Sequence, residues 1–171
     1  EDPYSTFFNP EEKKIFEETG AQPDLENQAY IVGRLLKPEA RNDIIAFFAE
    51  KEIAPSAMMD ISDGLSSDIL HICNQSRVGC VLYEDKFPIH EEAKQFAYKL
   101  QLDPTACALS GGEDYELLFT ISQTDYEIVK DNKEISVIGF ITEEKEGSVI
   151  ITRAGNKHQL IAQGWNHALP K

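Results

Sequence analysis

Apolar residues recur at helical spacing along much of the chain. In the clearest case, Leu65, Ile69 and Ile72 fall on one face of a helix. Ser62 is a candidate N-cap for this helix, and Asp63 lies in the first turn, where the helix dipole favours a negative charge. The same spacing, with caps and proline stops, predicts helices over residues 10–18, 27–36, 41–51, 63–76, 91–100 and 123–131.

Other segments show the two-residue alternation of β-strands, most strictly from Tyr115 to Ile121. An acidic turn over residues 142–147 is expected to join the last two predicted strands as a hairpin. The pair at 103–104, Asp-Pro, predicts a loop, and the tail from Gly155 is expected to be mostly irregular. The predicted strands are 57–59, 78–83, 115–121, 135–141 and 148–153.

This mixture of strands, helices and a hairpin predicts an α+β fold, a mixed β-sheet layered with α-helices. Residues 1–40 are polar and rich in turn formers, so they are expected to be a connector and not part of a core. The beginning, Glu1-Asp2-Pro3, is an unlikely translation start. The chain is therefore expected to be trimmed from something longer.

The net charge of the chain argues against some classes of binding partner. The chain has 171 residues, of which 30 are acidic and 16 basic, and its formal net charge is −14. Such a field repels phosphate backbones and anionic lipid, so neither nucleic acid nor a membrane surface is an expected partner. No apolar run approaches the roughly 18 residues of a membrane helix, and the first residues do not resemble a signal peptide. The expected location is the cytoplasm.

The first candidate site is the predicted strand-to-helix turn that contains Asp60 and Asp63. Two such carboxylates about 4 Å apart repel by ~4 kcal/mol at an effective dielectric of ~20, and a divalent cation would reverse this repulsion. Mg²⁺ typically takes one or two carboxylates together with water and substrate phosphates, and Ser62 could offer its hydroxyl or amide to a phosphate oxygen. Alternatively, Ser62 only caps the helix and Asp60 is only solvated. Asp68, farther along, is expected to be a surface charge.

The second candidate site is the glycine pair Gly111-Gly112, directly before the best predicted strand. Consecutive glycines let a backbone approach a ligand closely, and Glu113 and Asp114 put a carboxylate beside that opening, which would suit a cationic ligand ring. The alternative is a tight loop followed by an edge carboxylate.

The tryptophan, histidines and cysteines give weaker indications of function. Trp165 is the only tryptophan, and it either fills the core or stacks on a flat, cationic ligand. The four histidines show no paired metal spacing. The cysteines, Cys73, Cys80 and Cys107, are odd in number and form no C-x-x-C pair, so they are expected to be small core residues.

Two long motifs resemble thiamine-monophosphate kinase, a member of the superfamily that includes aminoimidazole ribonucleotide synthetase. They are residues 57–68 (AMMDISDGLSSD) and residues 108–120 (ALSGGEDYELLFT). The likeness begins near Asn27, continues through residues 33–38 (GRLLKP) and ends with residues 164–167 (GWNH), in the family's order. It covers most of the chain.

The resemblance implies the C-terminal domain of that superfamily. Residues 1–40 would connect it to an N-terminal domain that is missing here, and residues 41–171 would form the C-terminal α+β domain. The implied reaction is transfer of the ATP γ-phosphoryl group to thiamine monophosphate, which gives thiamine diphosphate and ADP. It needs no protein nucleophile, because such transfer depends on positioning and on charge neutralisation by Mg²⁺.

By the family pattern, Asp60 and Asp63 would bind Mg²⁺, Ser62 would contact ATP, and Glu113 and Trp165 would contact the substrate. The family's N-terminal domain carries most of its metal-binding aspartates, its nucleotide loop and much of its dimer interface. We therefore expect a homodimer at full length and no kinase activity from the 171-residue chain alone.

Two other functions remain open from the sequence. One is a different ATP-using synthetase of the same superfamily, acting on another acceptor. The other is a non-catalytic α+β module, in which Asp60 and Asp63 are only charges at the start of a helix.

Overall fold

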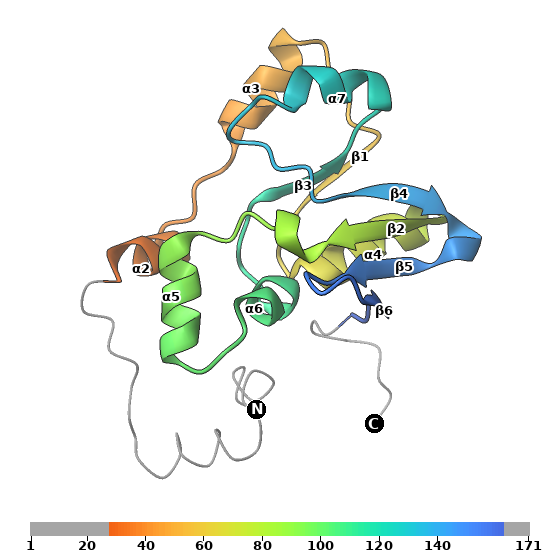
Figure 1. The fold of residues 1–171 in the computed structure, drawn as a ribbon. Coiled ribbons are helices and arrows are strands. Elements are labelled where there is room, and N and C mark those ends of the chain that lie inside the picture. The colour runs from red at the N-terminus through yellow and green to blue at the C-terminus, as the bar shows by residue number, and fades with distance from the viewer. Residues whose placement is uncertain (1–27, 163–171) are drawn as a thin grey trace, which may run out of the picture.

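The computed structural model of the protein describes residues 28–162 (Figure 1). The predicted helix over residues 10–18 and Trp165 lie outside the described residues. In chain order, the elements are α2 (Ala29–Leu36), α3 (Asn42–Glu50), β1 (Ala57–Asp60), α4 (Leu65–Ser76), β2 (Val78–Tyr83), η1 (Glu84–Lys86), α5 (Glu91–Lys99), α6 (Pro104–Ser110), β3 (Leu117–Thr120), α7 (Gln123–Val129), β4 (Gly139–Glu143), η2 (Glu144–Glu146), β5 (Ser148–Ile151) and β6 (Lys157–Gln159).

The larger sheet has the strand order β4-β2-β5-β6 and is mixed. Its central strand β2 pairs antiparallel with β4 and parallel with β5, and β5 pairs antiparallel with β6. Helix α4 runs behind this sheet in Figure 1 and packs its apolar face on it. The predicted α+β fold, a mixed sheet layered with helices, is confirmed.

The predicted hairpin is wrong. Strands β4 and β5 do not pair with each other, because β2 lies between them. The acidic segment η2 is exposed as expected, but it carries the chain from one side of β2 to the other. The reason is burial: β2 carries the buried side chains Cys80 and Leu82, and a central strand can pair along both of its edges.

Two further elements differ from the prediction. The expected loop at Asp103 and Pro104 starts helix α6, where Asp103 accepts a hydrogen bond from the Ala106 amide at 2.9 Å and proline occupies the first turn. In the described part of the tail from Gly155, expected to be mostly irregular, residues Lys157–Gln159 form strand β6 against β5. Both elements are short, so neither leaves a clear periodic signal.

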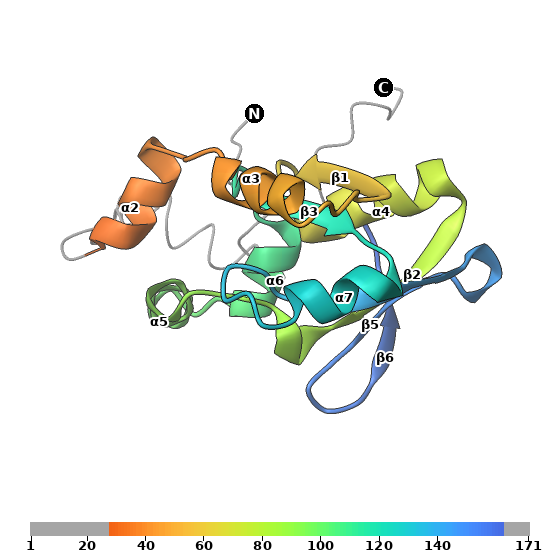
Figure 2. The same ribbon diagram turned by 90° about the horizontal axis from the view of Figure 1, so that it is seen from above.

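The smaller sheet consists of β1 and β3, paired antiparallel with Asp60 opposite Leu117. Helices α3 and α7 lie together beside these strands (Figures 1 and 2). They close a small core of Ile44, Phe48, Ile53 and Val129. The Phe48 ring contacts Phe119 of β3 edge to face, at 4.9 Å between centroids.

The main core lies between α4 and the larger sheet. Cys73 and Cys80 are each 1% exposed within it, as expected for small core residues, and Cys107 is half-buried. The buried members of this core are Leu65, Ile69, Ile72, Cys73, Cys80, Leu82, Phe87, Leu118, Ile150 and Leu160. No helix in the part of the chain that the structure describes is long and apolar enough to cross a membrane.

Candidate functional site

The site is built on the turn between β1 and α4. Asp60 ends β1, and α4 begins at Leu65. The N-cap of α4 is Gly64, with φ of 101°, so the prediction that Ser62 caps this helix is wrong. Two features of this position require glycine. The φ of Gly64 is unfavourable for other residues, and a Cβ atom would lie 2.8 Å from the Leu109 carbonyl oxygen.

Asp68 is buried beneath this turn. The prediction that it is a surface charge is therefore wrong. The side chain is 1% exposed. Its Oδ2 accepts hydrogen bonds from the backbone amides of Ser62 at 3.0 Å and Asp63 at 3.2 Å. Burial raises the pKa of Asp68, while the two amide hydrogen bonds act against this rise. Asp68 thus holds the start of the turn from inside.

The glycine loop before β3 lies directly against this turn. The Glu113 amide donates to the Ser62 carbonyl oxygen, and the Tyr115 amide donates to that of Ile61, both at 2.9 Å. A Cβ atom on Gly112 would lie 2.6 Å from the Ser62 carbonyl oxygen, so the close approach requires glycine. The two motifs, about fifty residues apart in the sequence, therefore form one continuous surface.

Glu113 has φ of 62° and Tyr115 has φ of 57°, so the backbone of this loop is held in an uncommon conformation. The next carboxylate, Glu116, is fixed by two guanidinium groups. Arg34 donates to its Oε1 at 2.7 Å, and Arg41 donates to its Oε2 at 2.5 Å. Helix α2 and the segment before α3 are thereby tied to the loop.

Arg34 also donates to the Asp114 carbonyl oxygen at 3.1 Å. The Asp114 carboxyl itself is partly shielded from water and lies near Glu116, and both effects raise its pKa, whereas Arg34 lowers it. The roles of Arg34, Arg41 and Glu116 were missed by the sequence analysis. No spacing rule connects residues that lie 75 or 82 positions apart.

The structure thus brings Asp60, Ser62, Asp63 and Glu113 to one region, while Trp165 lies outside the described residues. Asp60 and Asp63 are exposed, so a cation from solvent can reach them. Within residues 28–162, no group of three or more His, Cys, Asp or Glu side chains could hold a metal ion. The described residues therefore form no complete metal site, and the turn offers two exposed carboxylates, within the one or two that Mg²⁺ typically takes from a protein.

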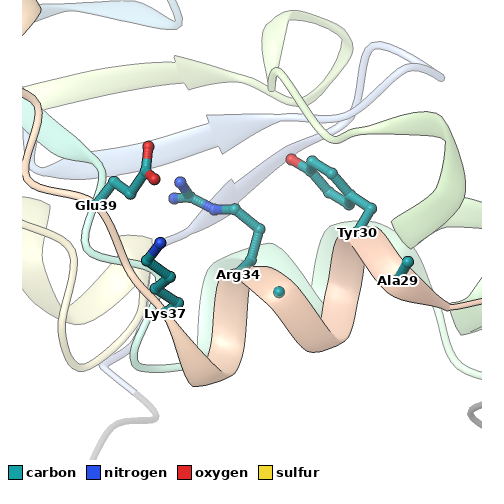
Figure 3. Close-up of a pocket in the computed structure, with 6 residues that line it drawn as sticks. Ala29, Tyr30, Arg34, Lys37 and Glu39 are labelled. Atoms are coloured by element: carbon teal, nitrogen blue, oxygen red, sulfur yellow. The ribbon is translucent and has the colours of Figure 1, made fainter.

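A separate shallow pocket of about 290 Å³ lies along α2. Figure 3 shows Arg34, Lys37 and Glu39 with their charged ends on one side of it and Tyr30 farther along the helix. The Tyr30 ring stacks on His90, with 3.7 Å between centroids. This volume is at the lower end of the range for small-molecule sites, and the pocket contains none of the site residues predicted from the sequence.

The chain is similar to known proteins in sequence. The chain is 34% identical over 137 residues to thiamine-monophosphate kinase of Aquifex aeolicus, a match that covers 80% of this chain and 41% of that protein. It is 30% identical over 158 residues to the Bacillus subtilis thiamine-monophosphate kinase, covering 90% of this chain and 47% of that one. The chain thus spans less than half the length of these curated relatives.

Solved structures share the fold. The structure of AaThiL complexed with AMPPCP and TMP has a TM-score of 0.67 and 30% identity, covering 91% of this chain and 46% of that one. The hydrogenase maturation protein HypE in complex with ATP has a TM-score of 0.60 at 18% identity, over 72% of this chain and 40% of that one, which shows the fold alone. The family model for AIR synthase related protein, C-terminal domain, matches residues 11–158. The chain therefore belongs to the AIR synthase related protein family and carries its C-terminal domain.

Proposed function

We propose that this chain is the C-terminal part of a thiamine-monophosphate kinase, which transfers the γ-phosphoryl group of ATP to thiamine monophosphate with Mg²⁺. One observation carries the proposal: main-chain hydrogen bonds join the Ser62 turn to the Glu113 loop. They do so in a chain that is 34% identical to a curated thiamine-monophosphate kinase. The AMPPCP and TMP in the related structure support a nucleotide and a phosphorylated thiamine as ligands.

In this proposal, Asp60 and Asp63 hold Mg²⁺, Ser62 contacts ATP, and Glu113 contacts thiamine monophosphate. Mg²⁺ bound there would neutralise charge on the transferred phosphoryl group. The chain's own contribution is positioning. Gly112 allows the loop to approach the turn, and Arg34 and the neighbouring Arg41 fix Glu116, so that Glu113 is held at a set place beside the turn.

The proposal extends to the rest of the protein. The relatives are more than twice as long as the matched region, since it covers 41% and 47% of the two described above. We assign residues 1–40 to a connection with an N-terminal domain and residues 41–171 to the C-terminal domain. That N-terminal domain would complete the metal and nucleotide site, Trp165 would contact the substrate, and the complete protein would be a homodimer. The 171-residue chain alone would then be inactive.

The test is an assay of thiamine diphosphate formation from ATP, thiamine monophosphate and Mg²⁺. The full reading frame that contains this chain is assayed beside the 171-residue chain. Product from the longer protein only is the expected result. Product from the short chain would refute its dependence on a further domain, and no product from either would refute the kinase assignment.

Two variants of the longer protein test the proposed role of Asp63 in the same assay. Asp63→Asn should lower kcat at least about 100-fold, because the carboxylate proposed to hold Mg²⁺ in the transition state is lost. Glu92→Gln, which removes an exposed carboxylate at the start of α5, is the matched control and should leave kcat unchanged. Equal activity of both variants would contradict the role of Asp63.

A further inference from the structure

Asp68 has no part in the proposed ligand contacts, yet it is the most buried carboxylate of the site, with 1% of its surface exposed. Its Oδ2 is fully used by the amides of Ser62 and Asp63. Its Oδ1 is also buried but has no hydrogen-bond partner among the described residues. A buried carboxylate with one oxygen unpaired destabilises a fold compared with a group that is fully paired. The hydrogen bonds to the two turn amides, and not full pairing of the carboxylate, are therefore what the structure shows Asp68 doing here.

We propose that Asp68 is a positioning residue, which fixes the peptide groups of Ser62 and Asp63 through its Oδ2. Both amides point inward toward α4 and are hydrogen-bonded there. The same turn is held on its other side by the loop, through the Glu113 amide on the Ser62 carbonyl oxygen. With its peptide groups fixed from both sides, the turn has a single backbone conformation, and its side chains leave from fixed points.

These hydrogen bonds also limit which atom of Ser62 can donate to a ligand. Its amide donates to Asp68, so the hydroxyl is the remaining donor of Ser62 for a phosphate oxygen, and its carbonyl oxygen accepts from Glu113. Of the two contacts that the sequence allowed for a phosphate oxygen, hydroxyl or amide, the hydroxyl remains. The consequence for ATP rests on the proposed function, whereas the positioning of the turn does not.

Amide hydrogen exchange measured by NMR on the metal-free chain tests the inference. In the unmodified chain, the Ser62 and Asp63 amides should exchange as slowly as hydrogen-bonded amides, although they lie in a turn. Asp68→Ala should speed their exchange at least tenfold more than that of the α4 amides. Asp68→Asn, whose side-chain oxygen can still accept both amides, should restore part of this protection.

The matched control is Ile72→Val, which removes one methylene group from the buried face of the same helix without touching the turn. It should change exchange evenly along α4. If Asp68→Ala gave the same even change, or if the Ser62 and Asp63 amides of the unmodified chain exchanged like exposed amides, the inference would be overturned. Because no metal or substrate is present, this result is independent of the kinase assay, which tests the proposed function.

Discussion

At the scale of single residues, the site depends on the absence of side chains at two places. A Cβ atom on Gly112 would lie 2.6 Å from the Ser62 carbonyl oxygen, and one on Gly64 would lie 2.8 Å from that of Leu109. In both cases the nearby atom belongs to the backbone, which cannot move aside as a flexible side chain can. The contact between the turn and the loop therefore tolerates no added methyl group without a shift of one main chain.

Gly112→Ala should lower the free energy of unfolding by about 1–3 kcal/mol, the usual range for an overpacked site. Urea unfolding of the chain measures this change. The matched control is Gly33→Ala in α2, where a Cβ atom would meet nothing within 4 Å. That substitution should leave stability unchanged or raise it by up to about 1 kcal/mol. Equal effects of the two substitutions would contradict the close approach.

The sequence pattern around Asp68 predicted the helix but not the burial of this side chain. The apolar spacing of Leu65, Ile69 and Ile72 correctly predicted the helix and its buried face. The same pattern assigns a charged residue to the solvent, because it reports hydrophobicity and not hydrogen-bond partners. The partners of Asp68 are backbone amides of an irregular turn, whose direction follows from the positive φ of Gly64 and from the neighbouring loop.

At the scale of elements, Glu116 connects parts of the chain that share no sheet. Arg34 of α2 and Arg41 before α3 both bind this carboxylate at the start of β3. The Arg41 side chain is 16% exposed and that of Glu116 is 33% exposed, so water screens this pair only in part. The strength of the link determines how firmly α2 is held beside the loop.

A double-mutant cycle with Arg41→Met and Glu116→Gln should give a coupling energy of about 1 kcal/mol, from unfolding free energies measured at low salt. Raising the salt concentration should reduce it. The exposed pair Lys51 and Glu50, with side chains 42% and 70% exposed, is the comparison and should give less than about 0.5 kcal/mol. A coupling energy no larger than that of the exposed pair would show that Arg41 does not hold the loop.

Most elements could be predicted from local patterns, whereas their pairing could not. Helices α3, α4 and α5 and strand β2 lie within about two residues of the predicted bounds, because their apolar periodicity is strong. The predicted hairpin of residues 135–153 is wrong. In the sequence, two neighbouring β-rich segments joined by a turn look the same whether or not a third strand lies between them in the sheet. The meeting of the turn and the loop was likewise beyond local pattern, and only the resemblance to a family connected the two motifs.

At the scale of the whole molecule, the main core contains an ionisable group whose state reports global unfolding. Burial raises the pKa of the Cys80 thiol to about 12, with a smaller contribution from neighbouring Cys73 and an opposing hydrogen bond from Ser148. An unfolded cysteine has a pKa of roughly 8.5. The folded protein therefore keeps this proton over a pH range in which the unfolded chain loses it.

The direction of the pH effect on stability follows because proton binding by Cys80 is linked to folding. The neutral thiol favours the folded state fully below pH ~8.5, and this contribution is lost as pH rises toward the folded pKa of about 12. Unfolding free energy should fall between pH 9 and 11, with Cys80 contributing up to ~1.4 kcal/mol per pH unit. Cys80→Ala should show a shallower decline over the same range, whatever its stability at pH 7. Parallel declines would contradict a strongly raised pKa.

The pairing of β1 with β3 determines when the site can exist during synthesis. Ala57 pairs with Thr120, and the residues between them form α4, β2, α5 and α6. A chain emerging from the ribosome therefore exposes the Asp60 turn long before its partner loop has been made. The turn and the loop can therefore meet only after Thr120 has been synthesised. An incomplete nascent chain thus presents the carboxylates at the start of a helix, but not the surface that the turn forms with the Glu113 loop.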